Sequence, residues 1–257
     1  MKILCYKNKQ DYNFESMVSI LQKTKYKVGY LSGEIKNKEV QQFNPDVIIH
    51  NIAEAKVFPI ENNGISININ ETDSDNSFSL LDSNSKNFIP PFVVDKSYYV
   101  DPKNIRKFES EVVYIGSPFV FDKNLISFLC NSDIHFKFFD HNLVNINGYC
   151  GICHPSDYLK FYKYSKCSLV KKADAKRIMD IVISDGNPVL CDDYSEAIEK
   201  IQNSILKNEK YKIDGFSKED IIENHTVFDR MSNIFKHVGL TQVAKEIIKI
   251  KSDWIKK

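Results

Sequence analysis

Short apolar strands alternate with helical segments along most of this chain, and the alternation restricts its fold to the α/β class. Residues 2–6, 28–31 and 45–50 are apolar runs, and residues 13–24 and 38–43 between them carry apolar side chains near the helical period. The runs are continuous rather than alternating, which is typical of parallel strands covered on both faces. The first part of the chain is therefore predicted to form a parallel sheet between layers of helices.

A second series of strands and helices follows a change of composition. Residues 64–69 are the last expected strand of the first series, and residues 71–86 are polar and rich in Ser, Asn and Asp, which predicts a surface loop. Beyond a break near residue 95 we expect strands at 111–115, 134–139, 168–170 and 189–191, helices at 123–130, 156–164, 176–184 and 194–207, and only helices over 218–257. The prediction is an α/β protein with two Rossmann-like domains, residues 1–95 and 96–257, that face a cleft.

Composition places the chain among ordinary soluble globular proteins. Hydrophobic residues make up 42% and charged residues 27% of its 257 residues. The net charge of +1 provides no overall attraction to nucleic acid or to a membrane surface. The apolar start, MKILCYKN, is shorter than a signal-peptide core or a membrane span. We therefore expect a cytoplasmic protein without a membrane span.

The six cysteines of such a chain are expected to be reduced thiols. Cys150, Cys153 and His154 spell the C-x-x-C-H pattern of c-type haem attachment. That attachment needs an exported protein, and here the pattern lies in mid-chain before a predicted helix, so we do not expect haem. Neither Cys130 nor Cys167 supplies a second ligand pair at zinc spacing. No metal site is predicted.

The segment 171–190 contains the strongest candidate for ligand binding. Arg177 and Asp180 are three residues apart on a predicted helix, so their side chains share one face. Near a helix N-terminus, backbone N–H groups already favour phosphate. The pair therefore suits a nucleoside diphosphate, with the guanidinium on the phosphates and the carboxylate on the ribose hydroxyls. The alternative is a surface ion pair on an ordinary amphipathic helix.

Other candidates lie at the predicted strand ends. Lys171 and Lys172 add positive charge for a diphosphate, or they belong to a solvated turn. Gly116 and Ser117 are small enough to admit phosphates, or they form a simple turn. His50 ends the third strand, where a neutral imidazole can accept the proton of an acceptor hydroxyl or bond the donor sugar. The alternative for His50 is a buried histidine bonded to the backbone.

Several short motifs follow one another along the chain. They are the proline-to-aspartate segment 88–95, the strand 112–116, the acidic-then-aromatic helix 156–166, Arg177 to Asp180 followed by residues 186–190, and His225-Thr226 with Arg230. In their order they resemble the motifs of the CgeB-type (spore-maturation-protein-like) glycosyltransferases of the GT-B class, and the resemblance covers roughly residues 88 to 240.

This resemblance implies an enzyme that transfers a sugar from a nucleoside diphosphate sugar, such as a UDP sugar, to an acceptor hydroxyl. It implies a first, acceptor-side domain and a second domain that binds the nucleotide sugar. Residues 148–153, including Gly151 and Ile152, would then lie against the nucleobase, and the last helix, 242–257, would cross back to the first domain. Positive side chains and a helix end suffice to stabilise the leaving diphosphate, so no metal or other cofactor is expected.

Three departures from the family pattern keep other functions open. Asp180 stands where the family has glutamate, Lys172 stands where GT-B enzymes have an acidic residue, and residues 7–9 replace a glycine-rich loop. One alternative is therefore a catalytically silent module that binds a nucleotide or a glycan.

A third reading is a viral-type enzyme that glycosylates modified DNA bases. Basic residues of the first domain would line its acceptor groove, namely Lys7, Lys9, Lys23, Lys25 and Lys27. The acceptor is thus a glycan, a protein or modified DNA.

Overall fold

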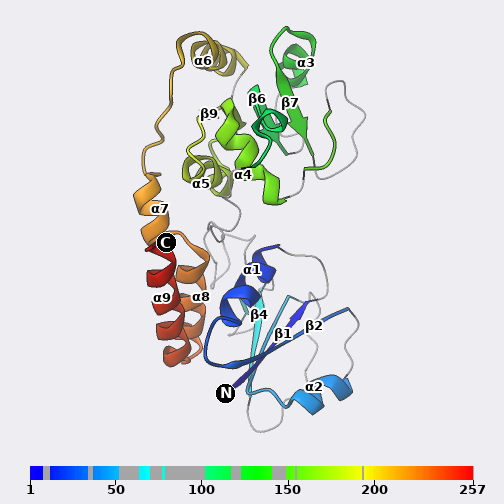
Figure 1. Cartoon of the computed structure of the whole chain (residues 1–257), viewed down its shortest axis with the longest axis vertical. Helices are drawn as coiled ribbons and strands as arrows, with labels where there is room; N and C mark the ends of the chain where they lie inside the picture. Colours follow the sequence, from blue (N-terminus) through cyan, green and yellow to red (C-terminus); the bar gives the residue numbers. More distant parts are fainter. Residues whose placement is uncertain are drawn as a thin grey trace. The chain divides into compact units, whose positions relative to one another are not determined.

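The computed structural model describes residues 1–7, 12–33, 37–51, 64–69, 77–78, 102–116, 123–140, 149–153, 155–192 and 194–256. The chain forms two compact units (Figure 1). Met1–Val94 and Asn224–Lys257 make up the first unit, and Asp95–Glu223 make up the second. Residues 224–257 therefore pack in the first unit. The predicted range of the second domain, 96–257, included them, although the last helix, 242–257, was expected to cross back to the first domain.

The first unit contains a parallel sheet with strand order β2-β1-β3-β4-β5. Its strands are β1 (Lys2–Lys7), β2 (Lys27–Ser32), β3 (Val47–His50), β4 (Ile65–Ile69) and β5 (Ser77–Phe78). Alternate side chains enter two separate cores: Ile3 and Ile49 belong to one, and Leu4 and Ile48 to the other. Both faces of the sheet are thus buried, as the continuous apolar runs predicted.

Helices from both ends of the chain cover the first sheet. They are α1 (Tyr12–Leu21), α2 (Asn37–Phe43), α8 (Val227–His237) and α9 (Thr241–Ile255). α8 and α9 lie side by side (Figure 1), and the rings of Phe228 and Trp254 are 5.3 Å apart between them. Phe228, Phe235 and Ile247 share a core with Phe14 of α1. Burial of these apolar faces accounts for the return of the chain to the first unit.

The strand β5 lies within a segment that was expected to be a loop. Ser77 pairs with Asn68 and Phe78 pairs with Ile69 in parallel register. A two-residue strand at the edge of a sheet needs only backbone hydrogen-bond partners, and β4 supplies them. The polar composition of residues 71–86 therefore did not indicate this strand.

The second unit contains a parallel sheet with strand order β7-β6-β8-β9. Its strands are β6 (Ser110–Ile115), β7 (Phe136–Phe139), β8 (Ser165–Val170) and β9 (Pro188–Leu190). Its helices are α3 (Lys123–Asn131), α4 (Pro155–Tyr164), α5 (Ala175–Ile183), α6 (Tyr194–Lys207) and α7 (Lys218–Asn224). A short 3-10 turn, η2 (Ile105–Lys107), precedes β6. β8 begins three residues earlier than predicted because Ser165 pairs with Ser110, and their hydroxyls lie 2.7 Å apart. The prediction of an α/β fold with parallel sheets is confirmed, whereas the cleft between the domains stays a prediction.

The strand order of the second sheet defines where a ligand site can form. From β6 the chain crosses to β7 on one side, and β8 then lies on the other side of β6. Ligands of open α/β sheets bind at such a switch point, beyond the carboxyl ends of the strands. Here these ends are Ile115 of β6 and Val170 of β8. Gly116 and the start of α5 lie directly beyond them.

Candidate functional site

Arg177 is positioned by the first turn of α5. The carboxylate of Asp174, the N-cap residue, accepts a hydrogen bond of 3.1 Å from the backbone N–H of Arg177. The other carboxylate oxygen of Asp174 lies 3.5 Å from Nε of Arg177. Ile178 and Ile181 of the same helix are buried and anchor α5 in the second unit. The Arg177 side chain is therefore directed to the carboxyl edge of the sheet and is 24% exposed.

The guanidinium of Arg177 lies directly over Gly116. A Cβ at Gly116 would be 2.5 Å from Nη1 of Arg177 and 2.9 Å from the hydroxyl of Tyr114. The guanidinium carbon is 6.0 Å from the centre of the Tyr114 ring, and Arg177 donates a hydrogen bond to the Tyr114 hydroxyl. Gly116 has φ +150, so both its backbone and its surroundings favour glycine.

The charges of this cluster are well defined at neutral pH. Burial raises the pKa of Tyr114 to about 12, so its phenol stays protonated. Burial alone would lower the pKa of Arg177, but Tyr162, Asp174 and Tyr114 together raise that pKa above its ordinary value. The site therefore presents a permanent cation beside a neutral hydroxyl.

The carboxylate of Asp180, predicted to bind the ribose hydroxyls, forms an ion pair with Lys176. Nζ of Lys176 lies 2.6 Å from both carboxylate oxygens of Asp180, one helical turn away. Burial raises the pKa of Asp180, and the Lys176 ammonium opposes this shift. A ribose hydroxyl would share the Asp180 carboxylate with Lys176.

Lys172 is paired with acidic side chains that follow β9. Its Nζ lies 3.2 Å from Asp192 and 3.5 Å from Glu196. Lys171 directly follows β8 and is half-buried. The two lysines therefore follow the carboxyl end of β8, where the diphosphate was predicted to bind, but Asp192 and Glu196 partly neutralise the charge of Lys172.

Residues 149–153 lie beside the carboxyl end of β7, where Tyr149 pairs with Phe138. The backbone N–H of Cys150 donates a hydrogen bond of 2.8 Å to the carbonyl of Phe138. Gly151 has φ +107, and the Ile152 side chain is 60% exposed. The predicted contact with a nucleobase stays a prediction. Ser117, the neighbour of Gly116, lies outside the described residues.

His50 ends β3 in the first unit and is 5% exposed. Its Nε2 lies 3.2 Å from the hydroxyl of Ser66. Burial lowers the pKa of His50 to about 4, so the imidazole is neutral at pH 7. It lies at the carboxyl edge of its own sheet, next to Tyr6 and Asn68 in register.

Comparison with known proteins yields distant structural similarity. No family model and no curated protein matches the chain. The chain is similar to a DNA-modifying β-glucosyltransferase studied with and without its substrate uridine diphosphoglucose, with a TM-score of 0.44 and 10% identity over 99% of both chains. It is also similar to the wall teichoic acid polymerase TagF, with a TM-score of 0.42 and 11% identity over 98% of this chain and 89% of that one. A third structure, D-2-hydroxyisocaproate dehydrogenase, has a TM-score of 0.22 and 10% identity over 68% and 63%. Similarity at this distance carries no argument about activity, so the proposals below rest on the site.

The structure adds residues that the motifs did not single out. Tyr114 lies in β6, two residues before Gly116, and alternation along the extended chain could have indicated it. Asp174 lies three residues before Arg177, which is the spacing of a helix N-cap. Asp140 directly follows β7, is 3% exposed and adds negative charge near Tyr114.

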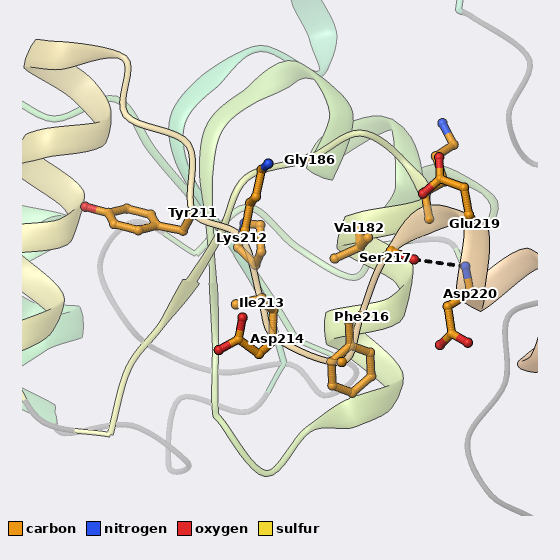
Figure 2. Close-up of a pocket in the computed structure, with 13 residues that line it drawn as sticks. Val182, Gly186, Tyr211, Lys212, Ile213, Asp214, Phe216, Ser217, Glu219 and Asp220 are labelled. Atoms are coloured by element: carbon orange, nitrogen blue, oxygen red, sulfur yellow. Dashed lines mark hydrogen bonds between the residues drawn. The ribbon is translucent and has the colours of Figure 1, made fainter.

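The cavity in Figure 2 lies away from the site formed by Arg177, Gly116 and Tyr114. It measures about 750 Å³ and is lined by Val182, Gly186, Pro188 and residues 211–220. Pro188 begins β9, so the cavity is at the amino-terminal end of that strand, whereas Arg177 is at the carboxyl ends. The hydroxyl of Ser217 accepts a hydrogen bond of 3.0 Å from the backbone N–H of Asp220 in the first turn of α7, marked by a dashed line in Figure 2. The cavity carries no group that the predicted chemistry uses.

Metal-ligating side chains, cysteines and helix lengths give no further site in the described part of the chain. No group of three or more His, Cys, Asp or Glu side chains there is arranged to hold a metal ion. Cys150 is exposed and Cys153 is buried. None of the described helices is long and apolar enough to cross a bilayer.

Proposed function

We propose that the protein is a glycosyltransferase of the GT-B class that transfers a sugar from a nucleoside diphosphate sugar to an acceptor hydroxyl. The observation that carries this proposal is the Arg177 guanidinium held over Gly116 between the carboxyl ends of β6 and β8. A fixed guanidinium at a switch point, beside a helix N-terminus, suits a diphosphate.

The proposed chemistry needs positive charge where the leaving group forms. Cleavage of the bond between sugar and diphosphate leaves negative charge on the nucleoside diphosphate. Arg177 and the N-terminal N–H groups of α5 stabilise that charge before the acceptor oxygen completes the transfer. This arrangement makes a metal ion unnecessary for the leaving group.

The remaining residues are assigned by the same proposal. His50 is neutral and takes the proton of the acceptor hydroxyl or bonds the donor sugar. Asp180 contacts the ribose, and Lys171 with Lys172 adds charge near the diphosphate. Gly151 and Ile152 contact the nucleobase. The first unit holds the acceptor, and the order of motifs supports the CgeB-type subgroup.

The acceptor is a glycan, a protein or modified DNA. Of the basic residues considered for DNA, Lys7 pairs with Glu15 and Lys25 lies 2.9 Å from Glu246. Lys9 lies outside the described residues. The described contacts therefore do not favour DNA over the other acceptors.

A catalytically silent module is the second candidate, and the pairing of Lys172 favours it. An acidic residue at this position would face the donor sugar, whereas Lys172 binds Asp192 and Glu196. Slow hydrolysis of a nucleotide sugar releases nucleoside diphosphate, which a coupled assay detects. Release that depends on the protein excludes the silent module.

The proposed function is tested by a panel of nucleoside diphosphates and their sugars. A ligand at 100 times its Kd stabilises the folded state by about 2.7 kcal/mol, which raises Tm measurably. We expect at least one nucleotide, such as UDP or GDP, to raise Tm and to bind in calorimetry. No shift and no binding across the full panel would reject the proposal.

A further inference from the structure

We propose that Tyr114 is a positioning residue that holds the guanidinium of Arg177 in its phosphate-binding orientation. The inference rests on the proposed function, because it concerns the same donor site. It assigns a role to a buried side chain of the motif 112–116 that was not predicted as a site residue.

The ring of Tyr114 is fixed by the core of the second unit. Tyr114 is 0% exposed and stacks on Phe138 of the neighbouring strand, with ring centres 5.7 Å apart and planes within 5°. Val112, Leu129 and Leu169 belong to the same core. Since cores are densely packed, the ring has little freedom to move.

The hydroxyl of this fixed ring is at the edge where Arg177 lies. It is 2.9 Å from the position that a Cβ of Gly116 would occupy, and Nη1 of Arg177 is 2.5 Å from the same position. Tyr114 accepts a hydrogen bond from Arg177. The buried hydroxyl thus has a charged donor as a partner, and such bonds are stronger than neutral ones.

Asp174 constrains the guanidinium from a second direction. Its carboxylate lies 3.5 Å from Nε, whereas Nη1 is the nitrogen beside the Gly116 position that the Tyr114 hydroxyl also approaches. A guanidinium is planar and has five N–H donors, so two partners define its plane and leave donors for a phosphate. An arginine held in this way does not have to be ordered when the ligand binds.

A double-mutant cycle tests this role with UDP and GDP as probes. Calorimetry measures the Kd of the wild type, Tyr114→Phe, Arg177→Ala and the double variant. Phe keeps the ring stacked and removes only the hydroxyl. We expect Tyr114→Phe to weaken nucleotide binding by about 3- to 10-fold when Arg177 is present, and to cause no further loss of affinity in the Arg177→Ala background.

Tyr211→Phe is the matched control. Its hydroxyl donates a hydrogen bond of 3.2 Å to the backbone carbonyl of Lys200, and Tyr211 lines the cavity at the amino-terminal end of β9. Its Kd should equal that of the wild type. An unchanged Kd for Tyr114→Phe, or an equal loss in both backgrounds, overturns the inference. Binding of neither probe by the wild type would count against the proposed function itself.

A second measurement needs no variant and remains decisive if Tyr114→Phe does not fold. In the nucleotide-free wild type, the hydrogen bond to Tyr114 restricts rotation about the Cζ–Nη bonds of Arg177. We expect separate NMR signals for the Nη protons of Arg177 at low temperature. Fully averaged signals overturn the inference, whichever nucleotide the protein binds.

Discussion

At the scale of single residues, Gly116 controls where the Arg177 guanidinium can lie. Gly116→Ala places a methyl group 2.5 Å from Nη1 of Arg177 and imposes a side chain on a backbone at φ +150. We expect the variant to lose stability by about 1–3 kcal/mol and to bind nucleoside diphosphate much more weakly. Chemical denaturation measures the first quantity and calorimetry the second.

Gly215→Ala separates backbone strain from the clash. Gly215 has φ +79 and is exposed, and a Cβ there has no heavy atom within 4 Å among the described residues. This variant should lose some stability but keep the nucleotide affinity of the parent. Equal affinities for the Gly116 and Gly215 variants would show that Gly116 does not position Arg177.

The pKa of His50 predicts a pH dependence of folding. Burial lowers this pKa to about 4 in the folded state, below its ordinary value of 6.5. Between these values the unfolded chain binds a proton that the folded protein does not, so this contribution to stability is lost as pH falls from 6.5 toward 4. Denaturation of the wild type and His50→Phe across this window measures the effect. The variant should depend less on pH, and parallel curves would contradict the assignment.

The motif around Arg177 could be recognised in the sequence, but its partners could not. Arg177 and Asp174 are close in the chain, so a helix start relates them. Tyr114 and Gly116 come from a strand about 60 residues earlier, and only the pairing of β6 with β8 brings them to α5. The Lys176–Asp180 pair has the i,i+4 spacing and was readable from the sequence.

At the scale of elements, the start of α8 depends on one carboxylate. Asp229 accepts hydrogen bonds from the backbone N–H and the hydroxyl of Thr226, at 2.9 and 2.6 Å. Lys251 of α9 is 6% exposed, and its Nζ lies 2.5 Å from Asp229. This carboxylate therefore caps one helix and binds the next.

Asp229→Ala should destabilise the protein by about 3–5 kcal/mol, because it leaves a buried ammonium without its carboxylate. Lys218→Ala is the control, since it removes a surface ion pair with Asp185 that contributes under ~1 kcal/mol. Urea denaturation measures both changes. Similar losses for the two variants would contradict the structural role of Asp229.

Whether a segment is a strand or a helix could be predicted from the sequence where its apolar pattern is long. The continuous runs identified the buried strands of both sheets, and α5 follows from the buried positions Ile178, Met179 and Ile181. β5 and the first residues of β8 were missed because their polar residues are held by the neighbouring strands β4 and β6. Pairing partners of this kind are not visible in a local pattern.

At the scale of the whole molecule, the predicted second domain, 96–257, included helices that pack in the first unit, although the resemblance implied that the last of them, 242–257, crosses back. Residues 224–257 belong to the first unit because Phe228, Phe235 and Ile247 complete its core. An amphipathic pattern shows that a helix has an apolar face. It does not show which sheet that face covers.

The central claim is that Arg177 binds the diphosphate of a donor nucleotide. Calorimetric titration of the intact wild type and Arg177→Ala with UDP and GDP tests it most directly. Lys212→Ala, which removes an exposed cation at the distant cavity, is the control. Loss of charge-assisted bonds predicts a Kd at least about 30-fold weaker, or about 2 kcal/mol, for Arg177→Ala alone. An Arg177→Ala protein that binds as tightly as the wild type, while losing several kcal/mol of stability, would contradict the claim and make α5 a purely structural element.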